Sequence, residues 1–471
     1  MILKKSLTFL MSIVCLHSLQ AQELTNLSLD TALNIMKNNN LELKISKFNE
    51  QIKLHEAKLT TGYNYGKLDL KFQALRSNDA GNIFGFKLKS REANFGDFGF
   101  SDFLGPLGGA ISGAANGNQP TDMSGLLQVQ PDDLNYPHAR NHFQTTLTYM
   151  LPLYTGGKLD QYSKITNALT YMSQLDTEKL LNEKVFQTTK TFYDISLINQ
   201  YIHNLGNIVT NINQLQNIVK SMKEEGFAKE IDELEVKARR SEAQSMLTQA
   251  TYNKELAYHY LSFLLNQDVK SIESINKLAP LPTSSKEELS ANNLDIQKAE
   301  LGLKITDMAI KLEESNFLPT VGAFGEYGSS DNKIFNDFIK KDFYTVGLQL
   351  EWNLFNGNID KENLEKAKIE NMKVQDQVDL AKAGISLQVK KLTTNIRSKD
   401  AEIESLKTQY RFAEKVYENY QGRYQEGISS ISDVLIKQSK ELEVLLKLLT
   451  AKNDRNAKVF ELTSILNKGI N

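Results

Sequence analysis

The sequence predicts a mainly α-helical chain with a β-barrel part, built from one supersecondary unit used twice. Three observations predict this class. All eight prolines lie outside residues 153–279 and 320–471, so helices in these stretches can be long. One offset of 201 residues carries residues 143 to about 240 onto the second stretch without a gap. Four short segments alternate apolar and polar residues with the period of a β-strand.

The helical prediction depends on apolar residues that recur every three or four positions in each repeat. Such spacing is typical of a coiled-coil seam, and the other faces carry Asn, Gln, Lys and Glu. The seam residues are Leu205, Ile208, Ile212, Leu215, Val219 and Met222 in the first repeat and Ile403, Leu406, Tyr410, Ala413, Tyr417 and Tyr420 in the second.

The duplication defines the predicted domains. YMLPLYTGGKL at 149–159 falls on LEWNLFNGNID at 350–360, and an offset of 253 carries residues 41–59 onto 294–312. Each repeat therefore reads as helix, strand, loop, strand, long helix, glycine turn and returning helix. We expect a first repeat over 22–275, a linker over 276–290 and a second repeat over 291–471.

The two repeats differ mainly in the loop between their strands. The offsets differ by 52 residues, all of which fall in the first loop. The sequence predicts strands at about 66–76, 142–154, 319–328 and 343–355, a long loop at about 77–141, and helical hairpins over 158–265 and 359–457. Ten glycines between Gly81 and Gly125 indicate loop and turn structure there.

The strands have one apolar and one polar face. Strands of about ten residues with this alternation are the signature of an outer-membrane barrel, although a soluble sheet with one solvated face is an alternative. Four strands cannot close a barrel, because transmembrane barrels have at least about eight, so the chain must share its barrel with copies of itself. The residues that we expect to face lipid are Tyr344, Val346, Leu348, Leu350, Trp352, Leu354, Leu147, Tyr149 and Leu151.

The N-terminus predicts export. Lys4 and Lys5 precede an apolar run, and Ala21 is a small residue suited to the position before a cleavage site. We therefore expect a cleaved signal peptide over 1–21. The only cysteine, Cys15, lies in it, so the mature chain has no thiol for disulfides, zinc-thiolate sites or nucleophilic catalysis.

Composition and motifs argue against nucleic-acid binding and catalysis. The net charge of −2 in 471 residues lacks the basic excess that phosphate neutralisation requires. His138 and His142 stand four apart, but the glutamate of HExxH is missing. No nucleophile, base and metal set converges, so we predict no catalytic residues, no cofactor and no metal site.

The order of four motifs resembles the TolC-like outer-membrane efflux proteins. These motifs are LSLDTALNIMKNNNLEL at 27–43, FLPTVGAFGEY at 317–327, LEWNLFNGN at 350–358 and YQEGISSISDVL at 424–435. The resemblance covers essentially the whole mature chain. It implies a homotrimer that forms one twelve-stranded barrel in outer-membrane lipid, continued by a periplasmic α-helical barrel.

The resemblance also implies a function and partners. It implies passive exit of substrates of a tripartite efflux pump or type I secretion system, with a periplasmic adaptor protein and an inner-membrane RND or ABC transporter as partners. An exported structural coiled-coil protein of the envelope is the alternative, which the alternating strands disfavour.

The turns of the helical hairpins are the candidate site. Gly226 and Gly427 stand 201 residues apart, as do Asp232 and Asp433. Glycine suits a turn with positive φ, and acidic side chains suit the first turn of the returning helix, where Ser430 and Asp433 form an S-x-x-D capping pattern.

By resemblance, Asp433 rings the tunnel entrance, and Asp232 and Tyr424 take part in the polar contacts that hold it shut. Gly226, Gly427 and Ser429 lie at tips that contact the adaptor. Ser429 and Ile436 stand where the family's best-known members carry an arginine and a second aspartate. For the loop over 77–141 we expect a flexible excursion, with a folded cap over the pore mouth as the alternative.

Overall fold

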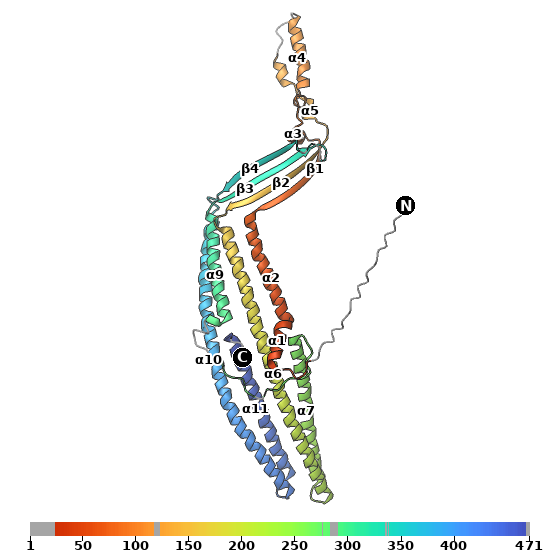
Figure 1. The fold of residues 1–471 in the computed structure, drawn as a ribbon, viewed down its shortest axis with the longest axis vertical. Coiled ribbons are helices and arrows are strands. Elements are labelled where there is room, and N and C mark those ends of the chain that lie inside the picture. Colours follow the sequence, from red (N-terminus) through yellow and green to blue (C-terminus); the bar gives the residue numbers. More distant parts are fainter. Residues whose placement is uncertain are drawn as a thin grey trace, which may run out of the picture. The chain divides into compact units, whose positions relative to one another are not determined.

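The computed structural model describes residues 24–116, 123–275, 277–282, 291–334, 337 and 339–467 (Figure 1). The predicted signal peptide lies outside these residues. The chain divides into two compact units, each of which takes residues from both repeats. The sheet unit consists of Lys53–Leu169 and Lys304–Met372, and the helical unit consists of the rest. Of the predicted class, mainly α with a β-barrel part, the mainly helical composition with a small sheet is confirmed.

The sheet unit contains one four-stranded antiparallel sheet in the order β1-β2-β3-β4. A register shift lies between Pro152 and Tyr154, where proline lacks the N–H that a ladder needs. The strand bounds are β1 Lys67–Ser77, β2 Arg140–Tyr154, β3 Thr320–Asp331 and β4 Asp342–Glu351.

Two helical hairpins with glycine turns make up most of the helical unit, and their first members begin within the sheet unit. The first is α6 (Lys158–Glu224) with α7 (Glu230–Leu265), and the second is α10 (Ile359–Gln425) with α11 (Ile431–Ile465). The first members of both hairpins have 67 residues and contain no proline, which permits this length. Shorter helices are α1 (Leu29–Asn39), α2 (Leu41–Gly62) and α9 (Leu294–Glu314). None of the described helices is long and apolar enough to cross a membrane.

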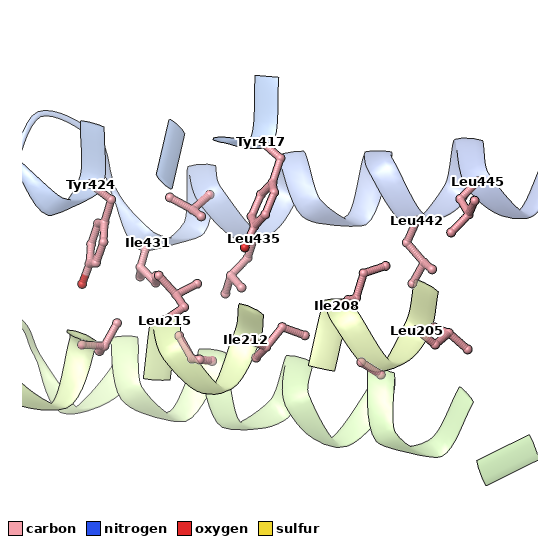
Figure 2. Packing of buried hydrophobic residues seen from close by; sticks show 14 of the residues in the cluster. Leu205, Ile208, Ile212, Leu215, Tyr417, Tyr424, Ile431, Leu435, Leu442 and Leu445 are labelled. Carbon is pink, nitrogen blue, oxygen red and sulfur yellow. The ribbon is translucent and has the colours of Figure 1, made fainter. Parts of the chain in front are cut away.

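The two hairpins share one apolar core, in which the predicted seam residues of α6 and three tyrosines of the α10 seam pack with residues of α7 and α11 (Figure 2). Of the other α10 seam residues, Ile403 and Leu406 pack on α11 in a second cluster. Leu205, Ile212, Leu215 and Val219 are fully buried, and Tyr417 is 3% exposed. Burial of a leucine or isoleucine side chain contributes about 1.5–3 kcal/mol, so the hairpins stabilise each other over much of their length.

Two extended segments, one before α1 and one in the predicted linker, form β-bridges and hydrogen bonds with residues of the helical hairpins or directly after them. Leu24 and Leu27 form parallel bridges with Val269 and Ile272, just after α7. Residues of the predicted linker are held by α11, because Asn456 Oδ1 accepts a 3.1 Å hydrogen bond from the main-chain N–H of Ala279. The buried Arg455 donates to the carbonyl of the same residue.

The long first loop contains more helix than the sequence predicts. It includes α3 (Ala80–Lys89), α4 (Phe100–Ala115) and α5 (Asp132–Asn135). Asp79 caps α3 by accepting a 2.8 Å hydrogen bond from the N–H of Asn82. Four glycines that favoured loop structure lie inside α4 instead, since each glycine costs a helix only about 1 kcal/mol relative to alanine.

Candidate functional site: helical tips and a two-faced sheet

The tips of the two hairpins have the same backbone turn. Gly226 and Gly427 have φ of 80° and 72°. The N–H of the residue after each glycine bonds back five residues, from Phe227 to the carbonyl of Met222 at 2.7 Å and from Ile428 to that of Arg423 at 2.8 Å. This is the Schellman arrangement, in which a residue of positive φ ends a helix.

Aspartates cap the returning helices, as the sequence predicts. In the second hairpin the capping is reciprocal: Asp433 Oδ2 accepts from the N–H of Ser430 at 3.3 Å, and Ser430 Oγ accepts from the N–H of Asp433 at 3.1 Å. In the first hairpin, Asp232 accepts a 2.8 Å bond from the N–H of Lys229, whose ammonium-bearing side chain has no acceptor atom. The second tip is therefore the more completely capped.

The charges at the tips differ in their surroundings. Asp433 is exposed, and the hydrogen bond from the Ser430 hydroxyl, followed by that from its N–H, lowers the pKa of the carboxyl; the positive charges of Lys437 and Arg423 add to this. Tyr424 is 6% exposed. Burial raises its pKa, and so does the negative charge of Asp232. Asp232 thus lies close enough to Tyr424 for its charge to act on the phenol, whereas the hydrogen bonds of Asp433 lie within its own hairpin.

The two positions that depart from the family pattern have different surroundings. The Ser429 hydroxyl donates to the carbonyl of Tyr420 at 3.3 Å, and so helps to close the turn. The ring of Tyr420 lies 5.0 Å from Lys437 Nζ and 5.4 Å from the guanidinium carbon of Arg423. Ile436 is an exposed apolar side chain.

Exposed apolar residues at the tips were not predicted. Phe227 is 77% exposed and Ile428 is 59% exposed. The two residues are again 201 positions apart, directly after the tip glycines. The duplication therefore contained the signal, because a large apolar side chain in the same exposed turn of both repeats is unusual for a solvated loop.

A buried polar cluster in the second hairpin was also missed. Tyr417 Oη and both amide atoms of Gln438 are buried and have no hydrogen-bond partner among the described residues. Burial, and the negative charges of Glu414 and Glu418, raise the pKa of nearby Glu441 to about 7. The sequence held a signal here too, since Gln438 and Glu441 occupy seam positions of α11 in the series Val434, Gln438, Glu441, Leu445 and Leu448.

One face of the sheet is apolar and exposed. Register places Leu70, Leu147, Tyr327 and Tyr344 side by side across the four strands. Tyr149, Leu151, Val346, Leu348 and Leu350 lie on the same face, and those of β4 are at least 65% exposed. Trp352 and Leu354, predicted within the last strand, are exposed but follow the end of β4 at Glu351.

The opposite face of the sheet is mainly polar. It carries Lys67, Asp69, Lys71, Gln73, Gln144, Thr146, Thr148, Glu326, Thr345 and Gln349. Two aromatic side chains toward one end of the apolar face direct polar atoms to main-chain acceptors. Tyr149 Oη donates to the carbonyl of Tyr65 at 2.7 Å, and Trp352 Nε1 donates to that of Phe317 at 3.1 Å.

Neither region assembles a metal centre. In the part of the chain that the structure describes, no three His, Cys, Asp or Glu side chains are grouped to hold a metal ion. His142 instead stacks on Phe86, with ring centroids 4.0 Å apart. The arrangement that remains is a sheet with an apolar and a polar face, and a helical unit with charged and apolar tips.

Comparison with known proteins gives a family-model match over part of the chain and a likeness of fold over most of it. Residues 286–468 match the sequence model of the outer membrane efflux protein family. A search of curated proteins finds no match. Three similar solved structures are CusC, the CmeC outer membrane channel of Campylobacter jejuni and the open MtrE outer membrane channel of Neisseria gonorrhoeae.

Each of these structures matches over most of its length. CusC has a TM-score of 0.75 at 15% identity, over 94% of this chain and 92% of its own. CmeC has 0.74 at 14%, over 94% and 86%, and MtrE has 0.73 at 14%, over 94% and 89%. At these identities the likeness concerns the fold. The predicted resemblance to the TolC-like outer-membrane efflux proteins is confirmed by the family-model match over residues 286–468 and by the likeness of the fold to these channels.

Proposed function

We propose that the protein is a trimeric exit duct of the bacterial outer membrane, through which substrates of a tripartite efflux pump or a type I secretion system leave the cell. The observation that carries this proposal is the two-faced sheet with two free edges. Strands β1 and β4 each pair on one side only within the described chain. Exposed apolar side chains and unpaired backbone groups at strand edges are unfavourable in water. In a closed barrel within lipid, the apolar side chains contact lipid and every strand is paired on both sides.

Three copies supply the missing strands. The strands have 10 to 15 residues, enough for the about 9–11 residues that a tilted strand needs to cross a bilayer. Twelve strands close with the apolar face toward outer-membrane lipid and the polar face toward a water-filled lumen. The helical hairpins of three copies then form the periplasmic wall of the duct.

The helical tips are the part of the duct that contacts its periplasmic partner. Phe227 and Ile428 offer exposed apolar surface to a periplasmic adaptor, which links the duct to an inner-membrane RND or ABC transporter. Gly226, Gly427 and Ser429 shape these turns. The duct performs no chemistry of its own, and the inner-membrane partner supplies the energy.

Asp433 sets the charge of the entrance in this proposal. Its carboxylate is exposed, and the lowered pKa keeps it ionised at neutral pH. Three copies place three such carboxylates around the axis, where they attract cations. Asp232 and Tyr424 contribute to the contact that holds the tips closed in this proposal, and Tyr424 lies buried in the core that the two hairpins share.

Assembly and conductance test the function directly. Outer-membrane fractions should contain a trimer that dissociates only on heating in detergent, and the purified trimer should conduct ions in planar bilayers. A soluble, non-conducting monomer would overturn the proposal and favour a structural coiled-coil protein of the envelope.

A charge-neutral variant tests the entrance. Asp433→Asn removes the charge but keeps an oxygen that can accept from the N–H of Ser430, so the helix cap is largely preserved. We expect weaker block of the trimer's conductance by divalent cations added on the tip side. Asp160→Asn, at another exposed aspartate in the first turn of a helix, is the control and should leave the block unchanged. Equal block in both variants removes Asp433 from the entrance.

A further inference from the structure

Part of the first loop lies across the polar face of the sheet. We name residues 80–98, which contain α3 and a short 3-10 helix at Phe95–Phe98, the strap. The ring of Phe86 in α3 stacks on His142, with centroids 4.0 Å apart and planes 5° apart. His142 projects from the same face of β2 as Gln144 and Thr146, and its ring bonds to the Gln144 side chain. The strap therefore covers the polar face at the loop end of the sheet.

Burial along the polar face agrees with this placement. His142 is 1% exposed and Ser330 on β3 is also 1% exposed, although both are polar. Farther from the loops, Asp69 and Lys71 on the same face are exposed. One end of the polar face is thus covered by the chain itself, while the remainder is open.

A partly buried network of ion pairs among Glu92, Arg140, Lys341 and Asp331, which we name the clamp, holds the strap to β2 and to the ends of β3 and β4. The Glu92 carboxylate bonds to Arg140 at the start of β2 and to Lys341 just before β4. Lys341 also pairs with Asp331 at the end of β3, at 2.8 Å. The side chains of these four residues are 5% to 26% exposed. Removal of one partner from such a network leaves a charge uncompensated, so the clamp resists opening.

Arg91 adds a strained anchor to the clamp. It ends α3 with φ of 54°, a conformation that L-residues rarely adopt, and the N–H of Glu92 bonds back to the carbonyl of Lys87 at 2.9 Å. Gly226 and Gly427 occupy the equivalent position in the helical tips. An arginine at this position costs about 1–2 kcal/mol of backbone strain. We therefore expect its side chain to make interactions that offset this cost. The guanidinium donates to the carbonyls of Lys340, at 3.2 Å, and Asp342.

We propose that the strap narrows the outer mouth of the duct and sets the size of solute that can pass there. This inference rests on the proposed function, because it takes the polar face as the lining of the lumen. A helix that covers this face occupies space inside the barrel, and three copies place three straps around one axis. The clamp and the Arg91 anchor hold each strap against the strands of its own chain.

The remainder of the loop is a separate excursion. A Cβ built on Gly99 would lie 2.8 Å from the Cα of Pro131, so the chain leaves and returns at one point. Residues 100–130, including α4, can therefore be excised and replaced by a short glycine link while the strap is kept. This excision is the matched control for loss of the strap.

Size-dependent cysteine labelling tests the proposal in intact cells. The only natural cysteine lies in the predicted signal peptide, so Thr148→Cys places a single thiol on the polar face of β2, six residues beyond His142. Cells are treated from outside with N-ethylmaleimide or with a maleimide carried on a polyethylene glycol chain. We expect the small reagent to react and the polymer to be excluded, both in the otherwise unchanged chain and in the excised variant.

Release of the clamp should abolish the size discrimination. With Phe86→Ala, Arg91→Gly and Glu92→Ala combined, the polymer should label Thr148→Cys as readily as the small reagent does. Equal labelling by both reagents before the clamp is released overturns the proposal, as does polymer access gained on excision of 100–130. Heat-modifiable trimers and conductance report on the duct separately, so a conducting trimer without size discrimination refutes the strap alone.

Discussion

The two helical hairpins use the same scaffold with opposite chemistry at equivalent positions. In the first hairpin, Arg240 is exposed and donates to Gln216 at 3.2 Å. The residues 201 positions later are Glu441, which is 8% exposed, and Tyr417, which is 3% exposed. The two hairpins have the same turns and the same seam. At these equivalent positions, however, the first hairpin has a solvated arginine and glutamine, and the second has a buried glutamate. The scaffold therefore tolerates chemical divergence at positions that its backbone does not constrain.

The largest effect is expected where the two hairpins are most alike. Leu205 and Leu406 are equivalent seam residues, 0% and 6% exposed. Leu205→Ala and Leu406→Ala should each lower the free energy of unfolding by about 2–5 kcal/mol, through lost burial and a residual cavity. Denaturation followed by far-UV circular dichroism measures both. Ile436→Ala, at an exposed tip residue, is the control; a cost there as large as in the seam would contradict this assignment of the core.

Dependence of stability on pH should separate the hairpins. The pKa of Glu441 is raised from 4.5 to about 7, so folding favours its neutral form. The stability that Glu441 contributes is complete below pH 4.5 and is lost as the pH rises to about 7, by up to about 3 kcal/mol. Glu441→Gln should remove this component of the pH dependence of thermal unfolding, whereas Arg240→Gln should leave it intact. An unchanged profile for Glu441→Gln would show that the acid is solvated.

Substitution of the tip glycines should affect the hairpins equally. Both glycines have positive φ, and a Cβ at either would meet no atom within 4 Å. The cost of Gly226→Ala and of Gly427→Ala is therefore backbone strain alone, about 1–2 kcal/mol each. Thermal unfolding of the two variants compares them. A difference well beyond this range between the two would indicate that the tips are held in different surroundings in the assembled protein.

Removal of the helix caps should distinguish the tips by a small amount. Ser430→Ala loses a side-chain cap and should cost about 0.5–2 kcal/mol. Lys229→Ala at the equivalent position should change the free energy of unfolding little, because the Lys229 side chain cannot accept from an N–H. Amide hydrogen exchange in the first turns of α7 and α11 reports the difference locally. Equal protection after both substitutions would mean that side-chain capping does not stabilise the second tip.

Much of the scaffold follows from spacing alone. The absence of proline, the three-four spacing and the tip glycines predict α6, α7, α10 and α11, because helix geometry depends on local chemistry and one apolar stripe. Alternation likewise predicts which residues share a face of the sheet. The end of β4 was predicted too late, since Trp352 and Leu354 continue the alternation beyond the last backbone pairing with β3.

The first loop and the buried acid were harder to predict, for different physical reasons. Glycine content made 77–141 read as turns, although Asp79 and the apolar residues of α3 are compatible with a helix that gains its stability from the sheet below. Glu441 lies at a seam position, but its burial depends on how α11 packs on other helices, which the spacing within one helix does not specify. The Glu92 clamp joins residues about 250 positions apart, beyond any local pattern.

The contact between Gly99 and Pro131 has a practical consequence. Because the chain departs and rejoins at adjoining backbone atoms, a foreign peptide with closely spaced ends can be grafted there without stretching the strands below. The position between Gly99 and Pro131 is therefore a suitable insertion site for epitopes or affinity tags.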